Sequence, residues 1–153
     1  MSVRILAVGK VKESYLQAGI LEYAKRLQPF VTFTIQEVKE SNTQDIARDL
    51  EQEGEALLQQ LKTDDYLISL ALEGTRASSF ELAAKIDNIQ TYQAKNIVFI
   101  IGGSRGLSQA VKAKSDLLLS FGPATYPHQL MRLILTEQIY RAFTIIHHQK
   151  YHK

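Results

Sequence analysis

The sequence contains no cysteine and only 3 prolines among its 153 residues. The absence of cysteine excludes a disulfide framework, a thiolate nucleophile and a cysteine-based zinc site. Long hydrophobic runs are also missing: the apolar run near the N-terminus covers only Ile5 to Val8, and no run elsewhere approaches the length needed to cross a bilayer. Such a run is too short for a signal-peptide core or a membrane span. We therefore expect a soluble, cytoplasmic protein with no membrane partner.

The overall composition is that of an ordinary globular protein, with 45% hydrophobic and 22% charged residues. A chain of this length favours a single domain, which we expect to cover residues 1–153. The formal net charge of +2 is too small to indicate a nucleic-acid binder by itself. The distribution of charge along the chain is more informative than its sum.

Two hydrophobic periodicities alternate along the chain. A period of two, or a short continuous apolar run, predicts strands at 3–8, 31–38, 66–72, 96–101 and 117–121. A helical period predicts helices at 14–27, 43–61, 78–89, 109–114 and 127–147. Such alternation favours an α/β fold with a mainly parallel sheet and helices on both faces. Ligands of these sheets bind where the strands end, so the loops 72–78, 102–107 and 121–127 are the candidate site.

The loop 102–107 is rich in glycine, which lets a backbone approach a ligand closely, although a plain turn between strand and helix has the same composition. It lacks the Gly-Lys-Ser/Thr of a P-loop and the spacing of a dinucleotide fingerprint. It does contain the Gly-x-Ser-x-Gly of serine hydrolases, with Ser104, Asp116 and His128 in the required order. The short chain after Ser104 and the lack of an oxyanion segment count against this alternative.

The loop 121–127 is uncharged and contains two prolines, so it is stiff and exposes backbone polar groups. These properties suit a flat heteroaromatic ring such as adenine. A connector that merely packs against its neighbours is the alternative interpretation.

The last predicted helix is apolar over most of its circumference, which indicates a second packing partner such as another copy of the chain. His128 and Arg132 share a face near its start, and Glu137 and Arg141 have the spacing of a structural ion pair. The tail carries positive charge and an aromatic ring, in Lys150, Tyr151, His152 and Lys153. This combination suits RNA phosphates and bases, although a frayed terminus has the same appearance.

Six segments together resemble one family: residues 5–12, 101–107, 120–121, 125–132 (Thr-Tyr-Pro-His-Gln-Leu-Met-Arg), 137–142 and the closing Tyr-His-Lys. They resemble the ribosomal RNA large subunit methyltransferase H family, the bacterial pseudouridine-N3 methyltransferases of the SPOUT class. The resemblance implies a mainly parallel sheet with a C-terminal trefoil knot, which no spacing rule predicts. It also implies a homodimer, S-adenosyl-L-methionine as cofactor, and large-subunit rRNA or the ribosome as substrate, with no DNA partner.

The resemblance also assigns roles to individual residues. The cofactor-binding residues it implies are Leu70, Gly102, Gly103, Phe121, Gly122, Pro123, Ala124, Thr125 and Tyr126. By residue type, the catalytic candidates are His128, Arg132 and His152, and the RNA-binding candidates are Arg141, Lys150, Tyr151 and Lys153; no metal is expected. Members of the family usually have an acidic residue directly after the position that matches Leu70. In this sequence that residue is Ala71, and Glu73 follows two places later. A non-catalytic RNA-binding dimer remains as a third alternative.

Overall fold

The computed structural model describes all residues from Met1 to Lys153 and contains one five-stranded sheet. The strands are β1 (Ser2–Val8), β2 (Thr32–Val38), β3 (Asp65–Arg76), β4 (Asn96–Ile101) and β5 (Leu117–Ser120). They lie in the order β2-β1-β4-β3-β5, and every neighbouring pair is parallel. The α/β class expected from the sequence is therefore confirmed.

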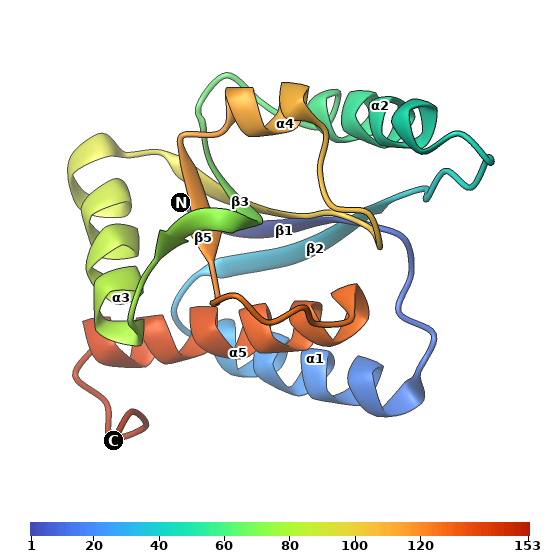
Figure 1. The fold of residues 1–153 in the computed structure, drawn as a ribbon. Helices are drawn as coiled ribbons and strands as arrows, with labels where there is room; N and C mark the ends of the chain where they lie inside the picture. Colours follow the sequence, from blue (N-terminus) through green and yellow to red (C-terminus); the bar gives the residue numbers. More distant parts are fainter.

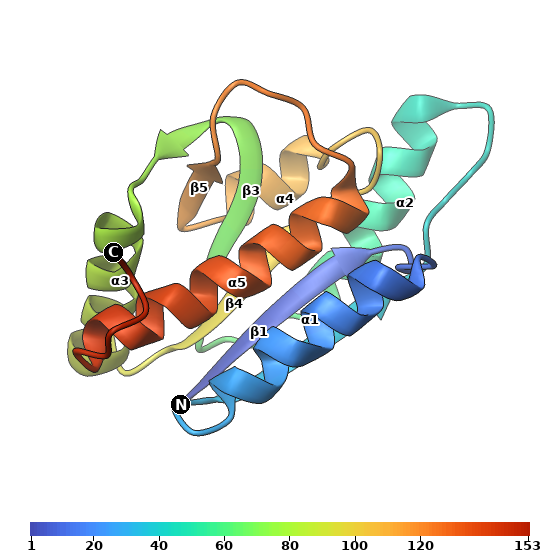
Figure 2. The ribbon, with the colours of Figure 1, turned by 90° about the horizontal axis from the view of Figure 1, so that it is seen from below.

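Helices cover both faces of this sheet (Figure 1). One layer holds α1 (Ser14–Leu27), α3 (Ser79–Asn88) and α5 (His128–Ile146), and the other holds α2 (Ile46–Leu58) and α4 (Gln109–Lys114). A short π-helix, η1 (Ile89–Gln93), follows α3. In the first layer α1 and α5 run side by side (Figure 2). No helix is both long and apolar enough to cross a membrane.

The sheet divides the apolar core into two parts because successive side chains of a strand point to opposite faces. On the α5 side, Ile5 of β1 and Phe99 of β4 belong to the same cluster as Phe143 of α5. On the α2 side, Leu6 and Val8 of β1 belong to a cluster with Leu57 of α2 and Val111 of α4. Burial on both faces explains the nearly continuous apolar runs of β1 and β4.

Two elements differ from the sequence-based prediction by more than one residue at an end. The helix expected at 43–61 covers only Ile46–Leu58. It begins at Ile46 because the side chain of Asp45 accepts a hydrogen bond from the backbone N–H of Arg48 and caps the helix there. Strand β3 continues beyond its expected end at Leu72 as far as Arg76. Its pairing with β5 is interrupted and then resumes, since both Leu70 and Thr75 lie opposite Leu119. Residues 71–74 therefore form a bulge instead of part of a loop.

Backbones pass very close to each other at this bulge. A Cβ atom on Gly74 would lie 2.7 Å from the carbonyl carbon and oxygen of Leu118 in β5. Only glycine therefore fits at this position without a shift of one strand. The bulge brings residues of β3 to the edge of the sheet where β4 and β5 also end.

Candidate functional site

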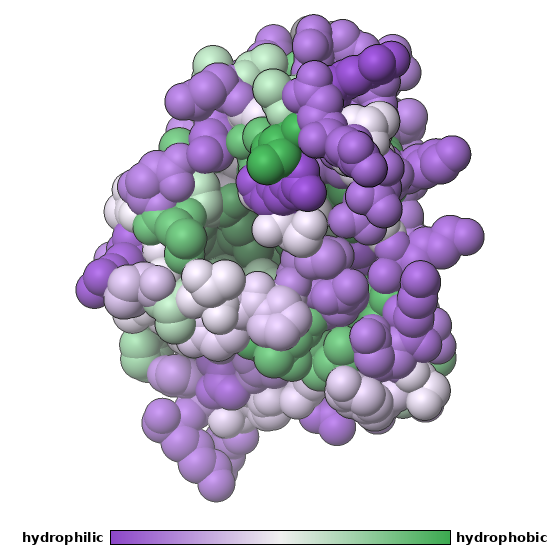
Figure 3. Space-filling model, turned by 45° about the vertical axis from the view of Figure 1, so that its right-hand side comes forward, coloured by the Kyte–Doolittle hydropathy of each residue, from purple (hydrophilic) through white to green (hydrophobic).

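A cleft of about 420 Å³ opens at the carboxyl ends of β3, β4 and β5. Its walls come from the β3 bulge, the glycine-rich turn after β4, the loop after β5 and the first turn of α5. Viewed from the side that carries these loops, the surface shows a hollow with a hydrophobic floor (Figure 3). The volume lies in the usual range of small-molecule sites. The three segments that the sequence indicated thus converge on one place, although the first contributes the β3 bulge in place of a loop.

Most of the predicted cofactor-binding residues line this cleft. They are Leu70, Gly102, Gly103, Phe121, Gly122, Ala124, Thr125 and Tyr126, whereas Pro123 is not part of the lining. The sequence reasoning missed Lys112, which reaches the cleft from α4, and Met131 from α5. Lys112 belongs to no recognisable motif, so only the packing of α4 reveals it, whereas Met131 lies within the segment 125–132 that carries the family resemblance.

The turn after β4 is held tight by backbone contacts. The N–H of Gly106 donates to the carbonyl of Gly103 at 3.1 Å, and these two residues form an isolated antiparallel bridge. A Cβ atom on Gly102 would lie 2.3 Å from the carbonyl oxygen of Gly106, so a side chain cannot be accommodated there. The turn therefore presents backbone groups to the cleft at its closest point.

One ion pair lies on the cleft wall. The Nζ of Lys112 is 2.7 Å from a carboxylate oxygen of Glu73, and both residues line the cleft. The hydrogen bond from Lys112 holds the pKa of the Glu73 carboxyl below its ordinary value. The carboxylate two places after Ala71 is thus turned toward the cleft and is already engaged by a cation.

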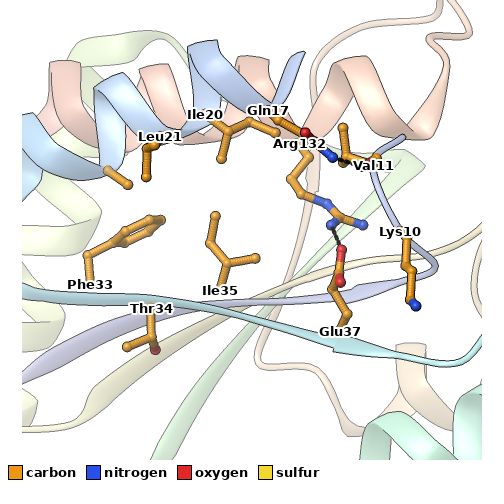
Figure 4. Close-up of a pocket in the computed structure, with 11 residues that line it drawn as sticks. Lys10, Val11, Gln17, Ile20, Leu21, Phe33, Thr34, Ile35, Glu37 and Arg132 are labelled. Carbon is orange, nitrogen blue, oxygen red and sulfur yellow. Dashed lines mark hydrogen bonds and ion pairs between the residues drawn. The ribbon is translucent and has the colours of Figure 1, made fainter. Parts of the chain in front are cut away.

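The structure separates the two catalytic candidates at the start of α5. His128 is half-buried and lines the cleft. Arg132 is buried, pairs with Glu37 of β2 and donates from Nη2 to the carbonyl oxygen of Gly9 at 3.1 Å. It lines a different groove, of about 640 Å³, between α1 and β2 (Figure 4). Arg132 therefore links α5 to the ends of β1 and β2, and its guanidinium does not line the cleft.

The tail lies at the other end of α5. The Nδ1 of His152 is 3.1 Å from Nη1 of Arg141, and the hydroxyl of Tyr151 donates to Glu137 at 3.0 Å. Burial is the first cause that raises the pKa of Tyr151 above its ordinary value. The expected pair of Glu137 and Arg141 is present, with Nε of Arg141 at 3.0 Å from Oε1.

None of the predicted RNA-binding residues lines the cleft, and neither does His152. The 19 residues of α5 correspond to about 28 Å of helix between the two ends. Within one chain, the structure thus brings His128 to the cleft and places His152 with Arg141 elsewhere.

Comparison with known proteins decides the family. The family model described as a predicted SPOUT methyltransferase matches residues 1–152. The chain belongs to the SPOUT methyltransferase family. Proteins named ribosomal RNA large subunit methyltransferase H are similar to it over the full length of both chains. Those from Limosilactobacillus reuteri and Latilactobacillus sakei are 47% identical over 159 aligned positions, and that from Listeria monocytogenes is 45% identical.

Solved structures also match this SPOUT methyltransferase. A probable methylase family protein from Haemophilus influenzae Rd KW20 gives a TM-score of 0.55 at 15% identity, covering 99% of this chain and 70% of the other. A probable methyltransferase from Bordetella pertussis Tohama I gives 0.55 at 13% identity, covering 92% and 95%. At these identities the likeness concerns the fold, which agrees with the SPOUT class expected from the sequence.

The hydrolase triad is not assembled in this SPOUT methyltransferase. Ser104 is exposed in the turn between Gly103 and Gly106, and α4 begins only at Gln109. The carboxylate of Asp116 accepts from the backbone N–H of Leu67 at 2.8 Å, near the amino ends of β3 and β5. No hydrogen bond joins Ser104, His128 and Asp116, so the Gly-x-Ser-x-Gly pattern marks a turn here.

Proposed function

We propose that this SPOUT methyltransferase transfers a methyl group from S-adenosyl-L-methionine to N3 of a pseudouridine in 23S rRNA, on the assembled ribosome and as a homodimer. The names of its full-length relatives support an rRNA substrate. The observation that carries the proposal is the convergence of the β3 bulge and two separate loops on one cleft, with nearly all of the expected cofactor residues in its wall.

The cleft fits the chemistry of this cofactor. Apolar side chains such as Leu70 and Phe121 suit the adenine ring, and the backbone around Gly102 and Gly122 offers hydrogen-bonding groups for the polar edges. The backbone-only approach at Gly102, where a Cβ would collide with Gly106, allows close contact with a ligand. The cofactor supplies a methyl group that is already activated on a sulfonium, so the protein's main task is to hold and orient the reactants.

A proton must leave N3 of the acceptor base during the reaction. His128 is the catalytic candidate in the cleft wall, and its Nε2 lies 4.0 Å from the position that a Cβ on Gly9 would occupy. We assign His128 to the acceptance of this proton, which requires an unprotonated ring nitrogen facing the substrate. We assign Arg132 a positioning role. Its hydrogen bond to the carbonyl of Gly9 connects α5, the helix that carries His128, with the end of β1.

The tail completes the site from a second copy of the chain in this proposal. Within one chain, His152 and Arg141 lie outside the cleft of that chain. A symmetric partner is therefore needed to bring these two residues to a base bound in the cleft. Half-exposed apolar residues of α5, among them Leu130 and Ile134, offer a contact surface for such a partner. The trefoil knot implied by the family resemblance belongs to the same proposal.

Methyl transfer to ribosomes tests the proposal directly. Ribosomes from cells that lack this gene are incubated with the protein and S-adenosyl-L-methionine labelled in the methyl group, with free rRNA and no-RNA controls. We expect label at a single pseudouridine of the large-subunit rRNA, and none after His128→Ala. Cofactor affinity and folding should survive that substitution. A folded protein that binds ribosomes but neither binds the cofactor nor transfers label would instead be a non-catalytic RNA-binding protein.

A further inference from the structure

Phe80 is a large hydrophobic side chain with 61% of its surface exposed. It lies in the first turn of α3, beside the C-terminal tail (Figure 1). Its ring centroid is 4.6 Å from that of His152, with the two planes nearly perpendicular at 89°. This contact leaves most of the Phe80 ring open to solvent. An aromatic ring in this state is available for stacking by a flat partner.

The backbone that carries Phe80 is held firmly. Ser78 and Glu81 form a reciprocal capping box at the start of α3. The hydroxyl of Ser79 donates to Oε1 of Gln138 in α5 at 2.7 Å. Because these bonds order the segment before any ligand arrives, a partner that stacks on Phe80 loses little affinity to the ordering of the protein.

Unpaired cations occur on the two chain segments that meet at this ring, the end of β3 and the tail. Arg76 ends β3, only Ala77 and Ser78 separate it from α3, and its side chain forms no ion pair. Lys150 and Lys153 of the tail are exposed and also form none. The nearby carboxylate of Glu81 is turned back to the N–H of Ser78. An exposed aromatic ring with unpaired cations on the adjoining segments matches a nucleotide, which offers both a base and phosphates.

We propose that Phe80 stacks on an unpaired nucleotide of the rRNA substrate that flanks the target base, while Arg76, Lys150 and Lys153 contact its phosphates. This inference rests on the proposed function and adds a substrate-positioning residue outside the cleft. His152 belongs to the tail and contacts both Phe80 and Arg141. A nucleotide stacked on Phe80 would therefore lie next to the tail that takes part in the proposed reaction. The platform therefore sets which unpaired segment of rRNA the tail can engage.

Substitutions of Phe80 test the proposal through ribosome affinity and steady-state kinetics. Phe80→Ala and Phe80→Leu should each raise KM for ribosomes lacking the modification about tenfold, the effect typical of one lost base stack. Both should leave kcat and cofactor affinity unchanged. Phe80→Trp should retain the wild-type KM. Tyr92→Ala is the matched control, because Tyr92 is 81% exposed but lies beyond the far end of α3.

Leucine separates stacking from simple packing, since it fills space against His152 but has no aromatic face. A wild-type KM for Phe80→Leu, or a fall in kcat at constant KM for Phe80→Ala, would show that the ring only positions His152. Arg76→Gln should reduce the salt dependence of ribosome binding by about one counterion. Sedimentation with large ribosomal subunits measures these affinities without methyl transfer. A failure of the proposed reaction is thus distinguishable from a failure of the platform.

Discussion

Arg132 illustrates how one residue links distant parts of the molecule. Its side chain is 3% exposed and joins α5 both to the carbonyl of Gly9 and to Glu37. Truncation to alanine should lower the free energy of unfolding by about 2 kcal/mol, because a charged hydrogen-bond donor is lost from a buried position. Glu37→Gln should cost less, since Glu37 remains 38% exposed and can be hydrated. Urea denaturation of the two variants measures the difference, whereas a purely catalytic Arg132 predicts unchanged stability.

A second prediction at this scale concerns pH. Burial raises the pKa of the Glu53 carboxyl above its ordinary value, although the N–H of Ser41 donates to it and opposes the shift. The neighbouring carboxylates of Glu40 and Asp49 raise it further, and Arg105 lowers it. The folded state therefore holds this proton more tightly than the unfolded state, and stability falls as pH rises through the window above the ordinary pKa of 4.5.

Glu53→Gln removes the buried charge while its amide oxygen can still accept the bond from Ser41. The variant should unfold at a higher temperature than the wild type near pH 7, and the difference should vanish below about pH 4. Thermal unfolding across this range provides the measurement. Equal melting temperatures at neutral pH would mean that the carboxylate is fully compensated in the folded protein.

The sequence predicted the residues of the cleft much better than the partners of buried charges. Gly102 and Phe121 follow strands whose apolar runs are easily recognised, so their place at the carboxyl edge follows from topology. Arg132 offers no comparable signal, because its partners Gly9 and Glu37 precede it by 123 and 95 positions. Only the finished packing of α5 against the sheet shows that this arginine lies in a different groove from His128.

At the scale of elements, the turn after β4 depends on one glycine. Gly102→Ala should disrupt the bridge between Gly103 and Gly106, because the new Cβ would lie 2.3 Å from the carbonyl oxygen of Gly106. We expect cofactor affinity to fall by at least about tenfold, the consequence of misplacing several backbone contacts worth about 1 kcal/mol each. Isothermal titration calorimetry with S-adenosyl-L-methionine measures the change.

Gly106→Ala is a useful control for this turn. Gly106 has a φ of +83°, but nothing lies within 4 Å of the position that its Cβ would take. Its substitution should cost about 1 kcal/mol of backbone strain without a collision. An equal loss of affinity in both variants would show that strain, and not the close approach at Gly102, controls the turn.

Strand β3 shows why element boundaries exceeded what the sequence could predict. The apolar run ends near Leu72, and the residues that follow are polar and contain a glycine, which is the usual pattern of a loop. The strand nevertheless resumes at Thr75, because the backbone of β5 is available for pairing there. The local sequence pattern indicates only the intrinsic propensity of a segment. The pairing of Thr75 depends on a residue of β5 more than forty positions away, which the local pattern does not include.

At the scale of the whole molecule, the proposed exchange of tails predicts complementation between two inactive variants. His128→Ala lacks the group in the cleft, and deletion of residues 151–153 lacks the tail. When equal amounts of the two variants exchange subunits at random, half of the dimers contain one subunit of each kind. Each mixed dimer would hold one intact site out of two, so about one quarter of the wild-type activity should return. Unmixed preparations of each variant serve as controls. No recovery despite exchange of subunits would place both groups in the same chain's site.

The bond between Arg132 and Gly9 also has a consequence for how the protein is made. Its two ends are separated by 123 positions, so the loop after the first strand gains this bond only when the last helix has docked. This contact of the N-terminal half cannot form before the C-terminal helix is present, and contacts between residues so far apart in sequence slow folding. During its own synthesis the chain therefore remains incomplete until its final residues have emerged. If it acts as proposed, an enzyme that modifies ribosomes becomes competent only after a ribosome has released it.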